Sequence, residues 1–285
     1  MSAPSIPVAG RAGPPSGSGL AGPSAPSAPH SSASLRVFEH DMLVFRRRWH
    51  SYLLSGLSQP FLYLLSMGIG LGVYVNRNGG LPGGVQYLDY IAPALLVTQA
   101  MMAAAFESAW PIMGKIVWDK TYQAALNTPI GATNLLAGDL MWIAFRAVLL
   151  SVLFFLVILA LRAVDSPLAV LAIPVAVLTA MSFAAPIMAF TATQKTDQAF
   201  NMLFRFGITP LFLFSGTFFP IDRLPLFLQP LAWVTPLYHG VSLARGLSLG
   251  QVDPVADLVH LSVLVTFAVA GFAAARVTFR RRLEV

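Results

Sequence analysis

The chain alternates between long apolar runs and short polar connections over most of its length. Six runs of about 20 or more residues carry very few charged side chains. A helix needs about 20 apolar residues to cross a hydrocarbon core about 30 Å thick. The pattern therefore predicts an all-α membrane protein in which residues 53–277 form a six-span transmembrane domain. The predicted spans are 54–75, 88–112, 136–161, 167–192, 199–219 and 256–276.

Two different segments precede the first apolar run. Residues 1–33 are rich in Ser, Pro, Ala and Gly, which predicts a disordered cytoplasmic tail. In residues 34–52, apolar side chains recur at spacings of three and four and so share one helical face. We expect this amphipathic helix to lie in the membrane interface; the alternative is a helix packed on a protein core. The apolar positions are Leu35, Phe38, Met42, Phe45, Trp49 and Tyr52.

Prolines interrupt the connection between the last two predicted spans. Ser215 to Asp253 has no charge between Leu224 and Val241, yet its prolines divide it too finely for a straight span. We interpret it as half-helices that re-enter the outer leaflet, where protein or a water-lined cavity must satisfy the backbone. The alternative is an apolar loop resting on the outer interface. The marker residues of this region are Gly216, Pro220, Pro225 and Pro236.

The composition agrees with a chain whose main solvent is lipid. Apolar residues make up 56% of the sequence, charged residues 11%, and the mean hydropathy is +0.70. A soluble domain carries about 25% charged residues. The net charge of +6 does not indicate nucleic-acid binding, because the basic residues flank apolar runs and form no dense patch. The absence of Cys excludes disulfides and thiolate metal sites.

The distribution of Lys and Arg predicts the orientation. One set of connections is rich in them, and the positive-inside rule places that set in the cytoplasm. An even number of spans then puts both termini there, with residues 278–285 as a basic cytoplasmic tail. The cytoplasmic set is Arg36, Arg46, Arg47, Arg48, Lys115, Lys120, Lys195, Arg276, Arg280, Arg281 and Arg282. The outer set is Arg77, Arg162, Arg223 and Arg245.

The sequence lacks a phosphate-binding loop and a zinc-protease motif. Gly114-Lys115 is not preceded by the earlier glycine of a phosphate-binding loop, and His-Glu-x-x-His does not occur. The five His residues are scattered, so we expect no metal site and no catalytic site. An intramembrane enzyme would need clustered polar groups at depth, and His239 and His260 are the residues whose replacement tests it. Any energy source must come from another chain or from an ion gradient.

The connection between the second and third spans, residues 115–134, has the character of a docking element. Trp118, Tyr122, Ala125 and Leu126 can share one face of a short helix, which Thr128-Pro129 ends. Such a helix suits docking into a groove of a partner; the alternative is a solvated loop with an interfacial Trp. The candidate coupling residues are Lys115, Trp118, Asp119, Lys120, Tyr122 and Gln123.

A few charges lie within the predicted spans, toward their cytoplasmic halves. Charged groups at depth are costly and usually face the bundle interior or a cavity. Asp139 and Arg146 are seven residues apart and share a helix face, and we expect Glu107 to pair with Arg146 or Arg205. The alternative for each Arg is that its guanidinium reaches back to the headgroups. The predicted network is Glu107, Asp139, Arg146 and Arg205.

From about Leu35 onward, the sequence resembles the ABC type-2 permease family, the membrane subunits of bacterial ABC exporters. Residues 214–225 read FSGTFFPIDRLP, residues 231–237 read LAWVTPL, and residues 244–246 read ARG. Residues 121–130, TYQAALNTPI, also resemble the family's loop between spans two and three, although family members often carry Glu where this chain has Gln123. The regions 103–107 and 126–139 look most like permeases of the nodulation lipo-oligosaccharide export type, with daunorubicin-type permeases as close neighbours.

The resemblance implies a permease without ATPase activity in a bacterial plasma membrane. ATP and Mg²⁺ would bind to separate ABC ATPase subunits, which would dock on a coupling helix near Lys115–Thr128. Two permeases, identical or paralogous, would form the pathway. The substrate would be an amphiphile such as a drug, a lipid or a lipid-linked saccharide moving out of the cytoplasm or the inner leaflet. The rival interpretation is a secondary transporter coupled to an ion gradient, which usually needs acidic residues near the bilayer midplane.

Overall fold

The computed structural model describes residues 30–77, 81, 84–227 and 229–284, and every regular element in them is helical. The predicted tail, 1–33, lies almost entirely outside the described residues. In chain order the elements are α1 (His30–Tyr63), η1 (Leu64–Leu71), α2 (Gly72–Arg77), α3 (Tyr87–Met113), η3 (Gly114–Trp118), α4 (Thr121–Leu126), α5 (Ala132–Ala160), η4 (Pro167–Leu171), α6 (Ala172–Thr193), α7 (Gln198–Met202), η5 (Leu203–Ile208), α8 (Thr209–Phe214), η6 (Ile221–Arg223), α9 (Gln229–Val234), α10 (Pro236–Leu249) and α11 (Pro254–Leu283). Here η marks a 3-10 or π-helical segment.

Among the described residues, four helices are long and apolar enough to cross a membrane. They are Tyr87–Trp118, Ala132–Ala160, Pro167–Thr193 and Pro254–Leu283. These correspond to the second, third, fourth and sixth predicted spans, and the all-helical class is confirmed.

The first and fifth predicted spans fall on interrupted helices instead. Residues 54–75 run through α1, η1 and α2, and residues 199–219 run through α7, η5 and α8 into a non-helical turn. The glycines at 68, 70 and 72 lower the helix propensity of the first of these segments. Pro210 cannot donate to the carbonyl of Phe206, which accounts for the widened π-helical turn before it. The total of six spans stays a prediction.

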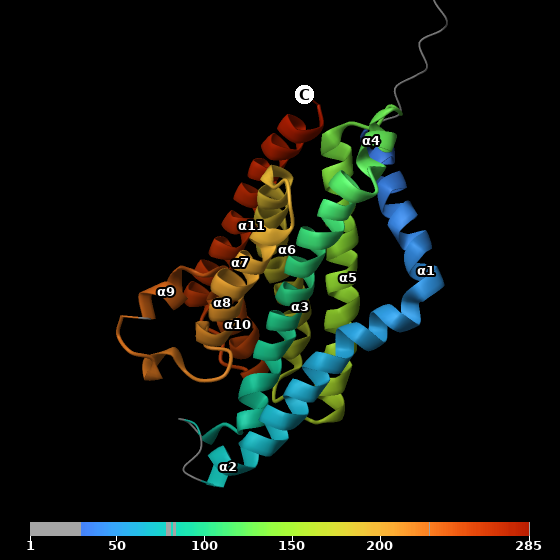
Figure 1. The fold of residues 1–285 in the computed structure, drawn as a ribbon. Coiled ribbons are helices and arrows are strands. Elements are labelled where there is room, and N and C mark those ends of the chain that lie inside the picture. The colour runs from blue at the N-terminus through green and yellow to red at the C-terminus, as the bar shows by residue number, and fades with distance from the viewer. Residues whose placement is uncertain (1–29, 78–80, 82–83, 228, 285) are drawn as a thin grey trace, which may run out of the picture.

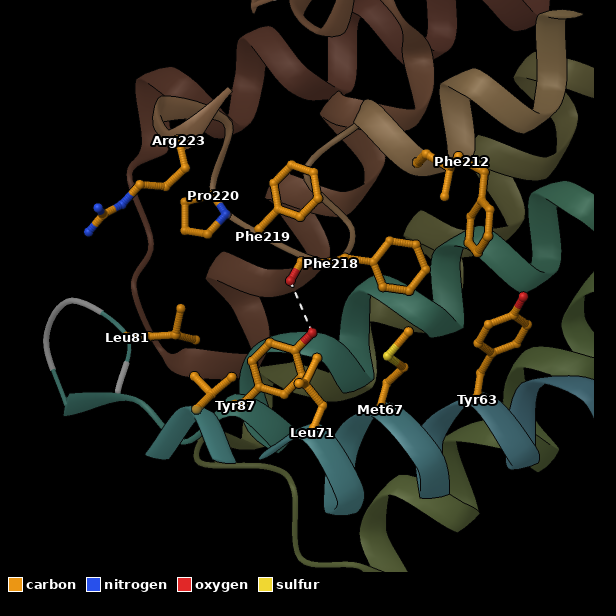
Figure 2. Close-up of a pocket in the computed structure, with 12 residues that line it drawn as sticks. Tyr63, Met67, Leu71, Leu81, Tyr87, Phe212, Phe218, Phe219, Pro220 and Arg223 are labelled. Atoms are coloured by element: carbon orange, nitrogen blue, oxygen red, sulfur yellow. Dashed lines mark hydrogen bonds between the residues drawn. The ribbon is translucent and has the colours of Figure 1, made fainter. Parts of the chain in front are cut away.

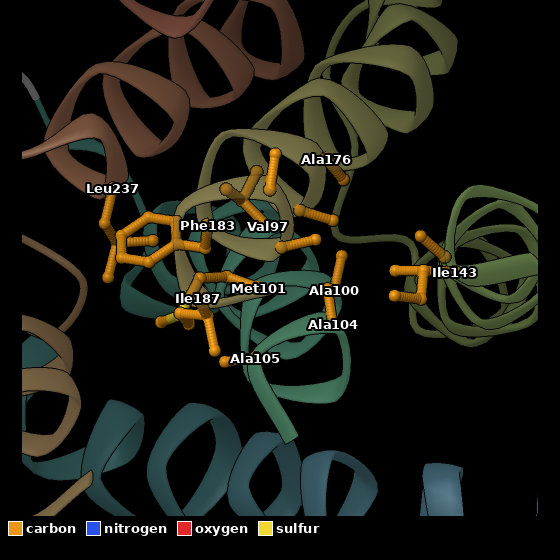
Figure 3. Packing of buried hydrophobic residues seen from close by; sticks show 14 of the residues in the cluster. Val97, Ala100, Met101, Ala104, Ala105, Ile143, Ala176, Phe183, Ile187 and Leu237 are labelled. Carbon is orange, nitrogen blue, oxygen red and sulfur yellow. The ribbon is translucent and has the colours of Figure 1, made fainter. Parts of the chain in front are cut away.

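Helix α6 lies at the centre of the bundle and makes the most extensive helix contacts in it, with α3 and with α11. Figure 3 shows buried side chains from these helices, and several are small, including Ala100 and Ala104 of α3 and Ala176 of α6. Small residues let helix backbones approach closely, and this is how helices associate when lipid removes the hydrophobic driving force. Gly271 of α11 serves the same purpose, because a Cβ there would overlap the ring of Pro186.

The predicted amphipathic segment forms the first half of α1 and runs along α5 (Figure 1). The rings of Phe38 and Phe145 are 5.9 Å apart, and those of Phe45 and Trp142 are 5.7 Å apart. In contrast, Leu35 and Trp49 are exposed. The predicted apolar face is therefore divided between α5 and the surroundings of the bundle. Beyond a bend, α1 continues toward α2 at the opposite end (Figure 1).

Candidate functional site

The loop between α3 and α5 forms a compact element at the end of the bundle that also carries the C-terminus (Figure 1). The backbone reverses at Lys120, whose φ of 52° lies in the left-handed region. The Gln123 amide donates to the Ile116 carbonyl at 2.9 Å and ties α4 back to η3. Trp118 is 57% exposed, and Asp119 and Lys120 are exposed beside it. The loop thus presents a small surface of one aromatic and two charged side chains.

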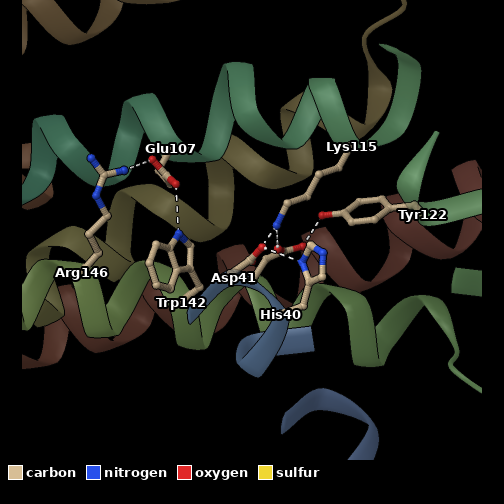
Figure 4. A network of polar contacts seen from close by, with 8 residues as sticks. His40, Asp41, Glu107, Lys115, Tyr122, Trp142 and Arg146 are labelled. Atoms are coloured by element: carbon tan, nitrogen blue, oxygen red, sulfur yellow. Dashed lines mark hydrogen bonds and ion pairs between the residues drawn. The ribbon is translucent and has the colours of Figure 1, made fainter. Parts of the chain in front are cut away.

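The other two predicted coupling residues point into the bundle. Tyr122 is buried, and its hydroxyl donates to Asp139 Oδ2. Lys115 Nζ donates to Asp139 Oδ1 at 2.5 Å and to Asp41 Oδ2 at 2.7 Å (Figure 4). We call Asp41, Lys115, Tyr122 and Asp139 the Lys115 cluster. This cluster joins α1, η3, α4 and α5. The sequence predicted that Asp139 belongs to a charge network, but it did not predict that Lys115 and Tyr122 are its partners.

Tyr122 has an electrostatic reason to stay protonated. Burial and the neighbouring Asp139 carboxylate both raise the pKa of the Tyr122 hydroxyl above its ordinary value of about 10. The hydroxyl is therefore a permanent donor to Asp139 over the physiological pH range. On its other side, the ring of Tyr122 lies 6.1 Å from that of Phe279 near the end of α11. Helix α4 is consequently held from both α5 and α11.

A second polar group lies one to two turns further from the loop. Arg146 donates to Glu107 Oε2, and Trp142 Nε1 donates to Glu107 Oε1 at 3.0 Å (Figure 4). Of the two partners predicted for Glu107, the structure pairs it with Arg146. Arg205 is exposed on η5, with its guanidinium 5.8 Å from the Phe206 ring centre. The carboxylate of Glu107 therefore links α3 to α5.

We expect Glu107→Gln to lower the free energy of unfolding by about 2 kcal/mol, because Arg146 would keep its charge without its anionic partner. Thermal unfolding in detergent micelles, followed by circular dichroism, measures the loss. The double variant Glu107→Gln/Arg146→Met removes both charges and is expected to recover most of it. Equal losses in the single and double variants would show that the ion pair is not the cause.

The opposite half of the bundle holds a non-helical turn from Ser215 to Phe219. Arg245 of α10 donates to the carbonyls of Tyr90 at 3.1 Å and Gly216 at 2.8 Å. Its guanidinium also lies 3.6 Å from the centre of the Tyr90 ring. The Tyr87 hydroxyl donates to the Phe218 carbonyl at 3.1 Å. Helices α3 and α10 thus satisfy a backbone that cannot satisfy itself.

The residues that marked the predicted re-entrant region occupy turns and helix starts. Gly216 has a φ of 79°, which explains the need for glycine in this turn. Pro220 precedes the short helix η6, Pro225 is exposed, and Pro236 begins α10. The sequence counted Arg245 only among the outer charges and did not predict its contacts with this turn. A lone Arg in an apolar stretch was the available signal.

His239 and His260 lie together although the sequence suggested scattered His residues. Their Nδ1 atoms are 2.7 Å apart, and His239 Nε2 is 2.8 Å from the Trp233 carbonyl. The carbonyl can only accept, so His239 Nε2 is the donor to it; with both rings neutral, His239 Nδ1 is then the acceptor and His260 Nδ1 the donor. Within the part of the chain that is described, no three His, Cys, Asp or Glu side chains form a group that could hold a metal ion.

Comparison with known proteins gives a consistent set of relatives. A family model described as ABC-2 type transporter matches residues 35–249. Nodulation protein J of Rhizobium leguminosarum bv. trifolii is 32% identical over 266 residues, which cover 93% of this chain and 99% of that protein. The protein of the same name from R. leguminosarum bv. viciae is 32% identical over 87% of this chain and 94% of its own. That of Rhizobium meliloti strain 1021 is 28% identical over 87% and 93%, respectively.

Proposed function

The chain belongs to the ABC-2 type transporter family, and from this premise we propose that it is the permease of an ATP-driven exporter with a separate ATPase subunit. ATP and Mg²⁺ bind to that subunit, and two permeases form the pathway for an amphiphilic substrate. The interrupted helices at 54–75 and 199–219 complete six spans in a bacterial plasma membrane. Both termini and the α4 loop then face the cytoplasm, α1 begins at the membrane interface, and the segments around α9 and α10 re-enter the outer leaflet.

The exposed surface of Trp118, Asp119 and Lys120 is the observation that carries the ATPase-docking proposal. The Lys115 cluster connects this surface, at the end of α3, to α1 and α5, and the contact of Tyr122 with Phe279 connects it to α11. The side chain of Glu284 adds a further link, because its Oε1 accepts from the Ala132 amide at 3.4 Å at the start of α5. A force applied at Trp118 is therefore passed to several helices together. Tilting them as a unit would shift the equilibrium between inward-open and outward-open bundles.

We assign different roles to the two halves of the loop. Trp118, Asp119 and Lys120 contact the ATPase, whereas Lys115 and Tyr122 position the loop through the buried Asp139. Gln123 fixes α4 against η3 through the Ile116 carbonyl. Glu107 and Arg146 hold α3 to α5 below the loop, so both helices move together.

The direct test is co-purification of the full chain with a candidate ABC ATPase subunit from the same organism, followed by substrate-stimulated ATP hydrolysis. We expect Trp118→Ala to weaken capture of the ATPase at least tenfold, because a central Trp in a small interface commonly contributes 2 kcal/mol or more. Trp233→Ala is the matched control, since Trp233 is 50% exposed on a different segment. Unchanged capture by Trp118→Ala would refute docking at this surface. Transport that survives ATP depletion but stops with the proton gradient would refute the exporter itself.

A further inference from the structure

A cavity of about 640 Å³ lies between the two interrupted helical segments. Figure 2 shows Tyr63, Met67 and Leu71 on one wall, and Phe212, Phe218 and Phe219 on the other. Its volume is within the range of sites that hold drug-sized ligands. One wall runs along the π-helical segment η1, and the other is formed by the end of α8 and by the non-helical turn that follows Phe214.

The cavity is elongated, and its two ends differ in chemistry. Tyr63 and Phe212 lie at one end, whereas Leu81, Pro220 and Arg223 lie at the other (Figure 2). The hydroxyl of Tyr87 on the wall is already committed to the Phe218 carbonyl. Among the described residues that line the cavity, Arg223 is the one with a charged side chain, and it is exposed. The lining therefore suits a ligand with an apolar chain and a head at the Arg223 end.

The surroundings of the charged end indicate the membrane surface. Phe219 lines the cavity and is partly exposed, and Leu226 and Phe227, which follow Arg223, are largely exposed. Exposed large apolar side chains beside a cation are typical of a segment in contact with lipid and headgroups. An amphiphile can then enter with its chain directed toward Tyr63 and its head left at the outer surface.

We infer that this cavity binds the apolar chain of a single-chain anionic amphiphile, whose head group pairs with Arg223. The inference rests on the proposed export function for the source of the ligand, namely the transported substrate. An anionic head complements the guanidinium, and burial of the chain between aromatic and aliphatic side chains supplies the affinity. The cavity then acts as the outer-leaflet station of the pathway within one permease.

The binding test uses the full chain in phosphatidylcholine nanodiscs without any ATPase. The probe is a 16-carbon fatty acid with a photoactivatable diazirine on its chain, at a pH where its carboxylate is ionised. We expect labelled peptides from residues 61–75 and 211–219. Met67→Trp fills the cavity and should weaken probe binding at least tenfold, whereas Leu258→Trp, at an exposed position of α11, should leave it unchanged. Equal effects of both substitutions, or labelling spread over α11, would overturn the inference.

The head and the chain are tested separately. Arg223→Gln should weaken binding of the fatty-acid probe at least fivefold and leave binding of the uncharged fatty alcohol of the same length unchanged. Arg162→Gln, at another exposed position, is the control and should change neither. Shortening the chain by two methylenes should weaken binding about 15-fold, since each buried methylene changes Kd roughly fourfold. The assignment of the two ends would be overturned if Arg223→Gln weakened binding of the probe and of the alcohol equally. It would also be overturned if the affinity did not depend on chain length.

A final arm separates the transported amphiphile from membrane lipid and from a second copy of the chain. Added phosphatidylglycerol, which has two chains, should not displace the probe, and the probe should label chains in single-copy discs as strongly as in two-copy discs. Displacement by phosphatidylglycerol would identify a lipid site, and loss of labelling in two-copy discs would identify a protein interface; either overturns the inference. Because no ATPase is present, such a failure leaves the docking result at Trp118 standing.

Discussion

Replacing Lys115 with Met is expected to lower the free energy of unfolding by about 3–5 kcal/mol, the typical cost of breaking a buried ion pair. Lys115 Nζ lies 2.5 Å from Asp139 Oδ1 and 2.7 Å from Asp41 Oδ2, and the Asp139 side chain is 1% exposed. Methionine has a similar volume, so the variant removes charge and hydrogen bonds with little change in packing. Two carboxylates would then face each other without a cation. Thermal and detergent-induced unfolding of the purified chain measure the loss.

The Lys115 cluster offers its own controls. Lys195→Met removes an exposed lysine and should change stability by no more than a few tenths of a kcal/mol. The triple variant Lys115→Met/Asp41→Asn/Asp139→Asn removes all three charges and is expected to regain most of the stability lost in Lys115→Met. If the triple variant is no more stable than Lys115→Met, the cluster does not stabilise the loop through its charges.

Replacing Arg245 with Met is the second change with a large expected effect, about 3 kcal/mol of unfolding free energy. The guanidinium donates to the carbonyls of Tyr90 and Gly216 and stacks on the Tyr90 ring, and Met replaces none of these contacts. Buried acceptors that lose their donors cost about 1–3 kcal/mol each. We expect Arg245→Lys to recover less than half of the loss, because an ammonium cannot span two carbonyls and a ring as the planar fork does.

Arg245→Met should also open the Ser215–Phe219 turn locally. The chain has no Cys, so Ser215→Cys introduces a single thiol at a buried position. A maleimide should label this thiol slowly in the otherwise unchanged protein and at least tenfold faster when Arg245→Met is added. Arg162→Met, at an exposed position, is the control and should not alter the rate. Equal labelling rates would show that Arg245 does not hold this turn.

Much of the fold followed from the apolar pattern because lipid imposes a simple rule. A segment of about 20 apolar residues must be helical when its backbone has no water to bond with, which is why residues 88–112, 136–161, 167–192 and 256–276 each match a long helix. The interruptions at 54–75 and 199–219 were not foreseen. Hydropathy does not register the backbone effects of Gly68, Gly70 and Pro210, which act on hydrogen bonding and not on solvent preference.

The candidate site divides in the same way. A charge within an apolar run is visible in one dimension, so Glu107, Asp139 and Arg146 were recognised, and the Trp118 loop stood out between two spans. The Asp41–Lys115 pair and the contacts of Arg245 were not foreseen, because Asp41 is 74 residues from Lys115 and Arg245 is 155 residues from Tyr90.

The sequence by itself determined that lipid surrounds much of this protein, that its fold is helical, and which family it belongs to. These properties depend on composition and on the local order of residues along the chain. Only the tertiary structure decided which of the loop residues face outward, which carbonyls Arg245 satisfies, and where a cavity opens between two irregular helices. Those features arise from side chains that meet across the bundle, and the energy of each contact depends on a distance that no spacing along the chain specifies.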